Sequence, residues 1–225
     1  GKNTKKYDSI LVLSHFKGHG LGGYGGALKQ LSIGFASSIG KTYIHSDGKN
    51  MDPNKLMENF CEDKIFKECM ADAASTIVKR YKGKIAFINC MINISVDCDC
   101  DGRAKPPCMK DIGLLSSIDP VALDQACLDL IYGSDQEGKE QLINRIESKI
   151  GLHIIDSAIH HGMGKNLQIS LSHNSMPSFS SSQMSGYLHR VSQISLQISS
   201  IYSSVVCLRL SRFTSCLMPC IVFAI

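Results

Sequence analysis

The chain has 225 residues, 44% of them apolar, and its net charge is +4 from 24 basic and 20 acidic residues. This length fits one or two domains, and the apolar content suffices for a hydrophobic core. The charges form no basic cluster that would indicate a nucleic-acid partner, and no run reaches the roughly 18 apolar residues of a transmembrane helix.

The early part of the chain predicts strand, loop, helix and strand in that order. Ile10–Leu13 is a short apolar run typical of a buried parallel strand, and a glycine-rich loop follows it. A helix is expected from Ala27, and a second strand at Thr42–Ile44 that leads into His45 and Asp47. This order is how α/β proteins build ligand sites, so a site is expected here.

The later elements continue the alternation. Asp52-Pro53 and Asp119-Pro120 are signatures of helix starts. Helices are predicted over Leu56–Lys82, Val121–Tyr132, Gly138–Ile150 and around Ile155–His161, and strands over Lys84–Ile94 and Ile112–Ser116. We therefore expect an α/β domain over residues 1–165, with a mostly parallel sheet and flanking helices, incomplete at its N-terminus.

Residues 166–225 differ from the rest in composition. They contain no Asp, Glu or Lys, and 16 of these 60 residues are Ser. Such a segment is expected to lie outside the family domain, either as a frameshifted or mispredicted end or as a Ser-rich interaction tail.

The glycine-rich loop carries two overlapping G-x-G-x-x-G patterns, with Asp47 at about the distance of the acid in a dinucleotide fingerprint. The glycines begin five residues after the strand, whereas the fingerprint turn follows its strand at once. Nucleotide binding is therefore an alternative rather than the leading hypothesis. The candidate cofactor-binding residues are Gly22, Gly23, Gly25, Gly26 and His45.

Histidine and lysine side chains in and after this loop supply candidate chemistry. His15, Lys17 and Lys29 are candidate catalytic residues, and either lysine could hold an anionic group. His15 and His19 are candidate metal ligands, with hydrogen bonding to loop backbone as the alternative role.

The sequence Asp97-Cys98-Asp99-Cys100-Asp101 comes directly after a predicted strand. Its carboxylates and thiols repel one another as anions unless a cation or hydrogen bonds offset the charge. Cys98 and Cys100 are therefore candidate ligands for a soft metal ion or an iron–sulfur cluster. The spacing is not C-x-x-C, and the cysteine run of ferredoxins does not occur.

Ten cysteines and no secretion signal favour reduced thiols or metal ligands over a disulfide framework. The first residue is not Met, and the chain is expected to be a piece of a longer protein.

Four segments resemble domain-of-unknown-function family 362, often labelled as uncharacterised iron–sulfur centre proteins. They are SHFKGHGLGGYGGALKQLSIGFASSIGK, IHSDGK, INCMINISVDCDCDG and MKDIGLLSSIDPVALDQACLDLIY, in this order. The resemblance covers residues 1–164 and only the C-terminal half of the family domain. It implies a cytoplasmic protein. Many members carry a ferredoxin-like insertion where this chain has only Cys61 and Cys69, a departure that weakens the case for a [4Fe–4S] cluster.

The sequence thus predicts a metal- or iron–sulfur-associated redox protein acting on a small anionic substrate. The expected partners are that substrate or a redox partner protein, with no nucleic acid and no membrane. A non-catalytic electron-transfer or assembly module is an alternative, as is nucleotide binding by the glycine-rich loop. Whether the chain is an enzyme stays open.

Overall fold

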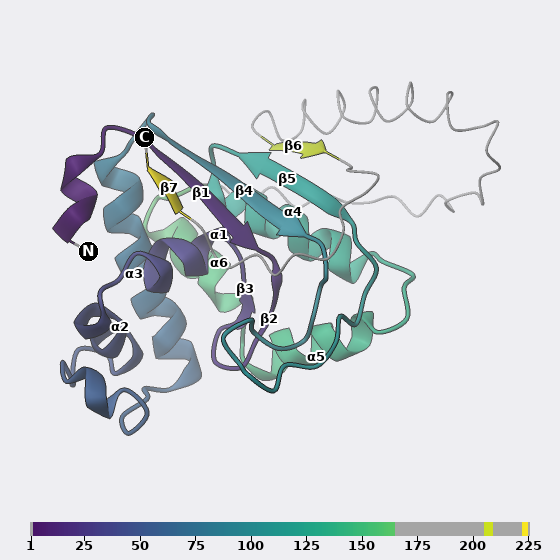
Figure 1. The fold of residues 1–225 in the computed structure, drawn as a ribbon, viewed down its shortest axis with the longest axis horizontal. Coiled ribbons are helices and arrows are strands. Elements are labelled where there is room, and N and C mark those ends of the chain that lie inside the picture. The colour runs from purple at the N-terminus through teal and green to yellow at the C-terminus, as the bar shows by residue number, and fades with distance from the viewer. Residues whose placement is uncertain (1, 165–204, 209–221, 225) are drawn as a thin grey trace.

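The computed structural model describes residues 2–164, 205–208 and 222–224. A five-stranded sheet lies at the centre, in the order β6-β5-β4-β1-β7 (Figure 1). Its strands are β1 (Ile10–His15), β4 (Ile85–Met91), β5 (Gly113–Ser117), β6 (Val205–Leu208) and β7 (Val222–Ala224). The predicted tail lies outside the described residues except for β6 and β7.

The two central strands, β1 and β4, are parallel, whereas β5, β6 and β7 each run antiparallel to their neighbour. The chain passes from β1 to β4 through helices, and such a crossover is what a parallel pair requires. From β4 to β5 it passes through a loop without a helix, and the second strand returns antiparallel. The α/β class with flanking helices is confirmed, and the sheet is mixed with a parallel centre.

The helices are α1 (Ala27–Lys29), α2 (Ser38–His45), α3 (Asp63–Arg80), α4 (Pro120–Tyr132), α5 (Lys139–Ser148) and α6 (His153–His160). Helix α1 continues into a π-helical turn, η2 (Gln30–Gly34), and short 3₁₀ turns cover η1 (Lys2–Lys6) and η3 (Pro53–Lys55). Helices α1 and α4 contact the central strands, where Val12 and Phe87 are fully buried. None of the helices within the described residues combines the length and the hydropathy that a membrane-spanning helix needs.

Two details of the predicted elements are wrong. Thr42–Ile44 is not a strand but belongs to α2, because Ser37 caps this helix by accepting a hydrogen bond from the Gly40 N–H. The β-branched Thr42 and Ile44 point into the core from the helix instead. The long helix begins only at Asp63, and Asp52 caps the short turn η3 rather than that helix.

The glycine-rich loop forms a second, two-stranded antiparallel sheet of β2 (Lys17–His19) and β3 (Gly23–Gly25). This hairpin is buried against α5 (Figure 1). At Gly23 the backbone has φ +82°, and a Cβ atom would lie 2.7 Å from the Cα atom of Gly151. Glycine is required there because two backbone segments touch.

Replacing Gly23 with alanine is expected to lower the free energy of unfolding by about 2–4 kcal/mol, from backbone strain and overpacking together. Gly20, at the tip of the same hairpin, has open space around its Cα, so Gly20→Ala should change stability by less than about 1 kcal/mol. Urea unfolding of both variants measures the difference. Equal stabilities would contradict the packing role given to Gly23.

Candidate metal centre

The loops that follow β1 and β4 meet at the carboxyl edge of the parallel pair. Backbone hydrogen bonds join them: the Phe16 N–H donates to the Cys90 carbonyl at 2.9 Å, and the Gly18 N–H donates to the Ser95 carbonyl at 2.8 Å. Ligand sites of open α/β sheets form at such edges, because loops from neighbouring strands converge there.

This edge brings together His19, Cys98 and Cys100, which offer ligand atoms that all lie within 4.8 Å of one another. The Cys98 and Cys100 sulfur atoms are 3.0 Å apart. His19 and Cys98 are buried, while Cys100 is exposed, so the group opens to solvent on one side. The Lys29 Nζ lies 4.0 Å from the Cys98 Sγ and places a cation beside the sulfurs.

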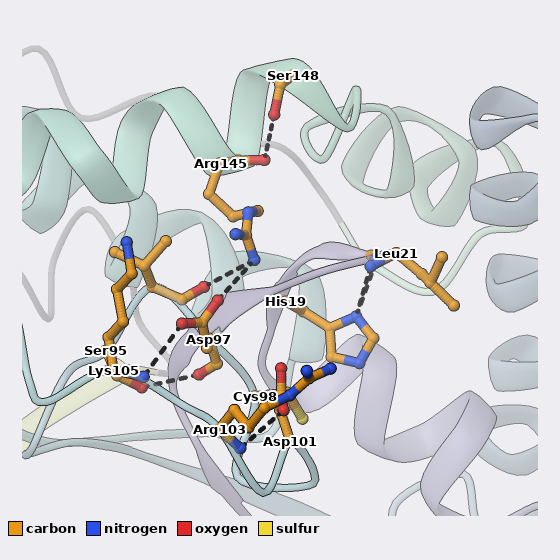
Figure 2. A network of polar contacts seen from close by, with 12 residues as sticks. His19, Leu21, Ser95, Asp97, Cys98, Asp101, Arg103, Lys105, Arg145 and Ser148 are labelled. Carbon is orange, nitrogen blue, oxygen red and sulfur yellow. Dashed lines mark hydrogen bonds and ion pairs between the residues drawn. The ribbon is translucent and has the colours of Figure 1, made fainter.

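His19 is oriented by the hairpin turn that follows it. Its Nδ1 accepts hydrogen bonds from the backbone N–H groups of Leu21 at 3.2 Å and Gly22 at 2.9 Å. Figure 2 shows the ring between this turn and Cys98. Burial, followed by the positive charges of Lys29 and Lys17, lowers the pKa of His19 to about 3. The ring is therefore neutral at physiological pH. Because Nδ1 accepts two N–H groups, the ring proton is on Nε2, and a metal ion would displace that proton on binding.

The three aspartates of the cysteine loop do not join this group, because each is engaged elsewhere. Asp97 pairs with Arg145 of α5 at 3.1 Å, and the Arg145 side chain reaches down to it in Figure 2. Asp99 pairs with Lys17 at 2.7 Å, and Asp101 accepts a hydrogen bond from the Arg103 N–H at 2.9 Å. The carboxylates thus hold the loop in place and leave the thiols to face His19.

His15 and Lys17 lie on the Asp99 side of the loop. The His15 Nε2 donates to the Ile92 carbonyl at 2.8 Å, and its Nδ1 lies 2.9 Å from the Asp99 carboxylate. Both nitrogens are occupied, so the structure does not bring His15 into the ligand group. Burial raises the pKa of Asp99, but the hydrogen bonds and charges of His15 and Lys17 outweigh it and lower the pKa to about 2.

The candidate cofactor-binding glycines pack against protein groups. A Cβ on Gly22 would lie 3.4 Å from the His19 ring, and one on Gly25 would lie 3.5 Å from the Lys29 side chain. Gly23 packs against Gly151, as described above. A Cβ on Gly26 would lie 2.5 Å from an Asp124 carboxylate oxygen.

His45 lies in the last turn of α2, where its Nδ1 is 2.6 Å from the Lys41 carbonyl. The ring packs against Phe60 and Phe66. Burial lowers its pKa, although the hydrogen bond with Lys41 acts in the opposite direction. His45 therefore lies in an aromatic contact rather than in the ligand group.

Asp124 of α4 is a buried carboxylate that sequence reasoning missed. It accepts hydrogen bonds from the Ala27 N–H at 2.8 Å, the Leu28 N–H at 3.0 Å and the Asn89 amide at 2.7 Å. It therefore occupies the N-terminus of α1, where a dinucleotide fingerprint would hold a phosphate. The available signal was an acid on the apolar stripe of α4, one turn from Val121 and Leu128.

Lys67 of α3 was also missed. Its side chain is fully buried, and its Nζ donates to the Leu21 carbonyl at 2.8 Å. Burial lowers its pKa to about 8, partly offset by Asp63. This bond fixes the turn whose N–H groups orient His19. The position of Lys67 among the apolar residues of an amphipathic helix was only a weak indication that this lysine is buried.

A family model described as Domain of unknown function (DUF362) matches residues 1–129. The chain belongs to this family. The matched range contains the hairpin, the cysteine loop and most of α4, and so the whole candidate centre of this DUF362 protein. No curated protein and no solved structure matches the chain.

Proposed function

We propose that this DUF362 protein binds one soft divalent metal ion through His19, Cys98 and Cys100, for redox or Lewis-acid chemistry on a small anionic substrate. The observation that carries the proposal is the convergence of one imidazole and two thiols within 4.8 Å, at an edge open to solvent. Thiolates and imidazole together suit zinc or iron.

The number of ligands favours a reactive ion over a structural one. Structural zinc sites are closed by four protein ligands, whereas catalytic sites keep three and leave one position for water or substrate. The described residues offer three here, and Cys100 lies on the exposed side. A bound ion would therefore have a position that a substrate can reach.

Lys29 is the better candidate for holding an anionic substrate. The Lys17 ammonium lies 2.7 Å from the Asp99 carboxylate and is 1% exposed. Lys29 is half-buried, and its ammonium faces the Cys98 sulfur at 4.0 Å. An anion bound at the open position would meet this charge.

An iron–sulfur cluster fits the described donors less well than a single ion. Clusters of the common types are held by four thiolates. The third cysteine of the loop, Cys108, directs its Sγ to the Ile94 carbonyl at 3.4 Å, and Cys69 directs its Sγ to Asp47 at 3.6 Å. Two thiols and one imidazole instead make up the group.

The test is a cobalt(II) and zinc titration of the reduced full chain under anaerobic conditions. We expect one ion per chain, with thiolate-to-cobalt absorption. His19→Ala, Cys98→Ser and Cys100→Ser should each lower the affinity by more than the roughly 10–100-fold that losing an outer-sphere partner costs. Cys69→Ser is the matched control and should bind as the wild type does.

Lys29→Met separates metal binding from anion binding. It should keep the ion, because Lys29 is no ligand, and weaken the spectral change that added azide causes in the cobalt form. The proposal would be overturned if the wild-type chain bound neither ion. It would also be overturned if all three ligand variants bound the ion as tightly as the wild type does. A broad iron–sulfur absorption with several irons per chain would replace the single ion by a cluster.

A further inference from the structure

The two sulfur atoms of the centre lie close enough to react with each other. The Cys98 and Cys100 Sγ atoms are 3.0 Å apart, and a disulfide bond is about 2.05 Å long, so the bond needs an approach of only about 1 Å. A turn closed by the Asp101 N–H donating to the Cys98 carbonyl at 2.9 Å brings these side chains together. Cys100 is exposed, as a thiol that attacks a substrate must be, and Cys98 is buried, as suits the thiol that resolves the mixed disulfide.

The tautomer of His19 adds a second argument. Its Nδ1 accepts two backbone N–H groups, so in the neutral ring the proton is on Nε2. The nitrogen left to the sulfurs is therefore a hydrogen-bond donor in the metal-free chain. The Lys29 ammonium lies 4.0 Å from the Cys98 Sγ, and the Cys100 S–H group donates to the same sulfur, so these contacts hold the two sulfur atoms together.

We propose that the metal-free chain has a dithiol–disulfide exchange activity, in which Cys98 and Cys100 reduce a small-molecule disulfide. This goes beyond metal binding and does not depend on it. Bound metal would hold both thiolates and block the exchange, so the two properties would belong to different states of one centre.

The reaction has two exchange steps. Cys100 loses its proton to water and attacks one sulfur of the substrate; the substrate S–S bond breaks and a thiolate leaves. That thiolate takes the proton from Cys98, which then attacks the Cys100 sulfur and releases the second thiolate, protonated by water. The substrate gains two electrons, and the dithiol loses two in becoming a disulfide.

The experiment uses the reduced full chain, freed of metal by a chelator, mixed with glutathione disulfide, alkylated and mapped by peptide mass. We expect a Cys98–Cys100 disulfide in the wild type. Cys98→Ser should instead accumulate a mixed disulfide with glutathione on Cys100, because the resolving thiol is gone. Cys100→Ser should lose most of the adduct, because the remaining Cys98 is buried.

Cys69→Ser is again the control and should form the Cys98–Cys100 disulfide at the wild-type rate. Zinc added first should slow the reaction in proportion to the ion bound. No disulfide in the wild type, or no adduct on Cys100 in Cys98→Ser, would overturn the inference. Disulfide formation in a chain that binds no metal would support it while refuting the proposed function.

Discussion

Replacing Asp124 with alanine is expected to lower the free energy of unfolding by about 3–5 kcal/mol, because it leaves buried donors without an acceptor. The carboxylate is fully buried and receives the Ala27 and Leu28 N–H groups and the Asn89 amide. It thereby joins α4, β4 and the start of α1, the helix that carries Lys29. Urea unfolding measures the loss.

Asp135→Ala is the matched control, since it removes the same group from an exposed position and should change stability by about 0.5 kcal/mol or less. A comparably small loss for Asp124→Ala would contradict the role of Asp124 in joining these elements.

Asp124 also predicts a pH dependence with a definite sign. Burial raises its pKa from 3.8 to about 6 despite the hydrogen bonds it accepts. The folded state therefore holds the proton more tightly than the unfolded chain does. The contribution of this group to stability is greatest below pH 3.8 and declines as the pH rises through about 6. The difference in free energy of unfolding between the wild type and Asp124→Asn should therefore shrink as the pH rises from 3.8 to about 6.

Replacing Asp99 with asparagine is expected to have the second large effect, a loss of about 2–3 kcal/mol, because a Lys17 ammonium that is 1% exposed loses its carboxylate. Asp99 stands between the two cysteines and holds their loop to β1 and β2 through His15 and Lys17. We therefore also expect metal affinity to fall by about 10–100-fold, as for other outer-sphere partners. Unfolding and cobalt titration measure the two effects.

Asp101→Asn is the matched control in the same acidic run, because Asp101 is exposed and accepts the backbone N–H of Arg103. It should change stability and metal affinity little. If Asp99→Asn destabilises the chain but leaves the metal affinity of the folded fraction unchanged, Asp99 has no positioning role.

The pH dependence of Asp99 has the opposite sign to that of Asp124. Its pKa falls from 3.8 to about 2 in the folded protein. The stability that the Asp99 carboxylate contributes is complete above pH 3.8 and is lost as the pH falls towards 2. The stability difference between the wild type and Asp99→Asn should therefore be constant at neutral pH and vanish in acid.

Local features whose causes lie within a few residues could be predicted from the sequence. The apolar runs give β1, β4 and β5, and Asp119-Pro120 starts α4 where it was predicted. The alternation of Asp and Cys after β4 marked the loop that carries the centre. The strand predicted at Thr42–Ile44 was wrong. Its β-branched residues favour a strand, but the cap at Ser37 and packing against the core stabilise a helix there.

Which of the candidate residues meet depends on how distant parts of the chain pack together. The sequence offers no reason to prefer His15 or His19 as a metal ligand. In the structure, His15 is held by Asp99 and a backbone carbonyl, while His19 faces the cysteines. The same holds for Lys17 and Lys29, one paired with Asp99 and the other beside Cys98. Such choices depend on contacts between loops about 80 residues apart, which sequence spacing does not encode.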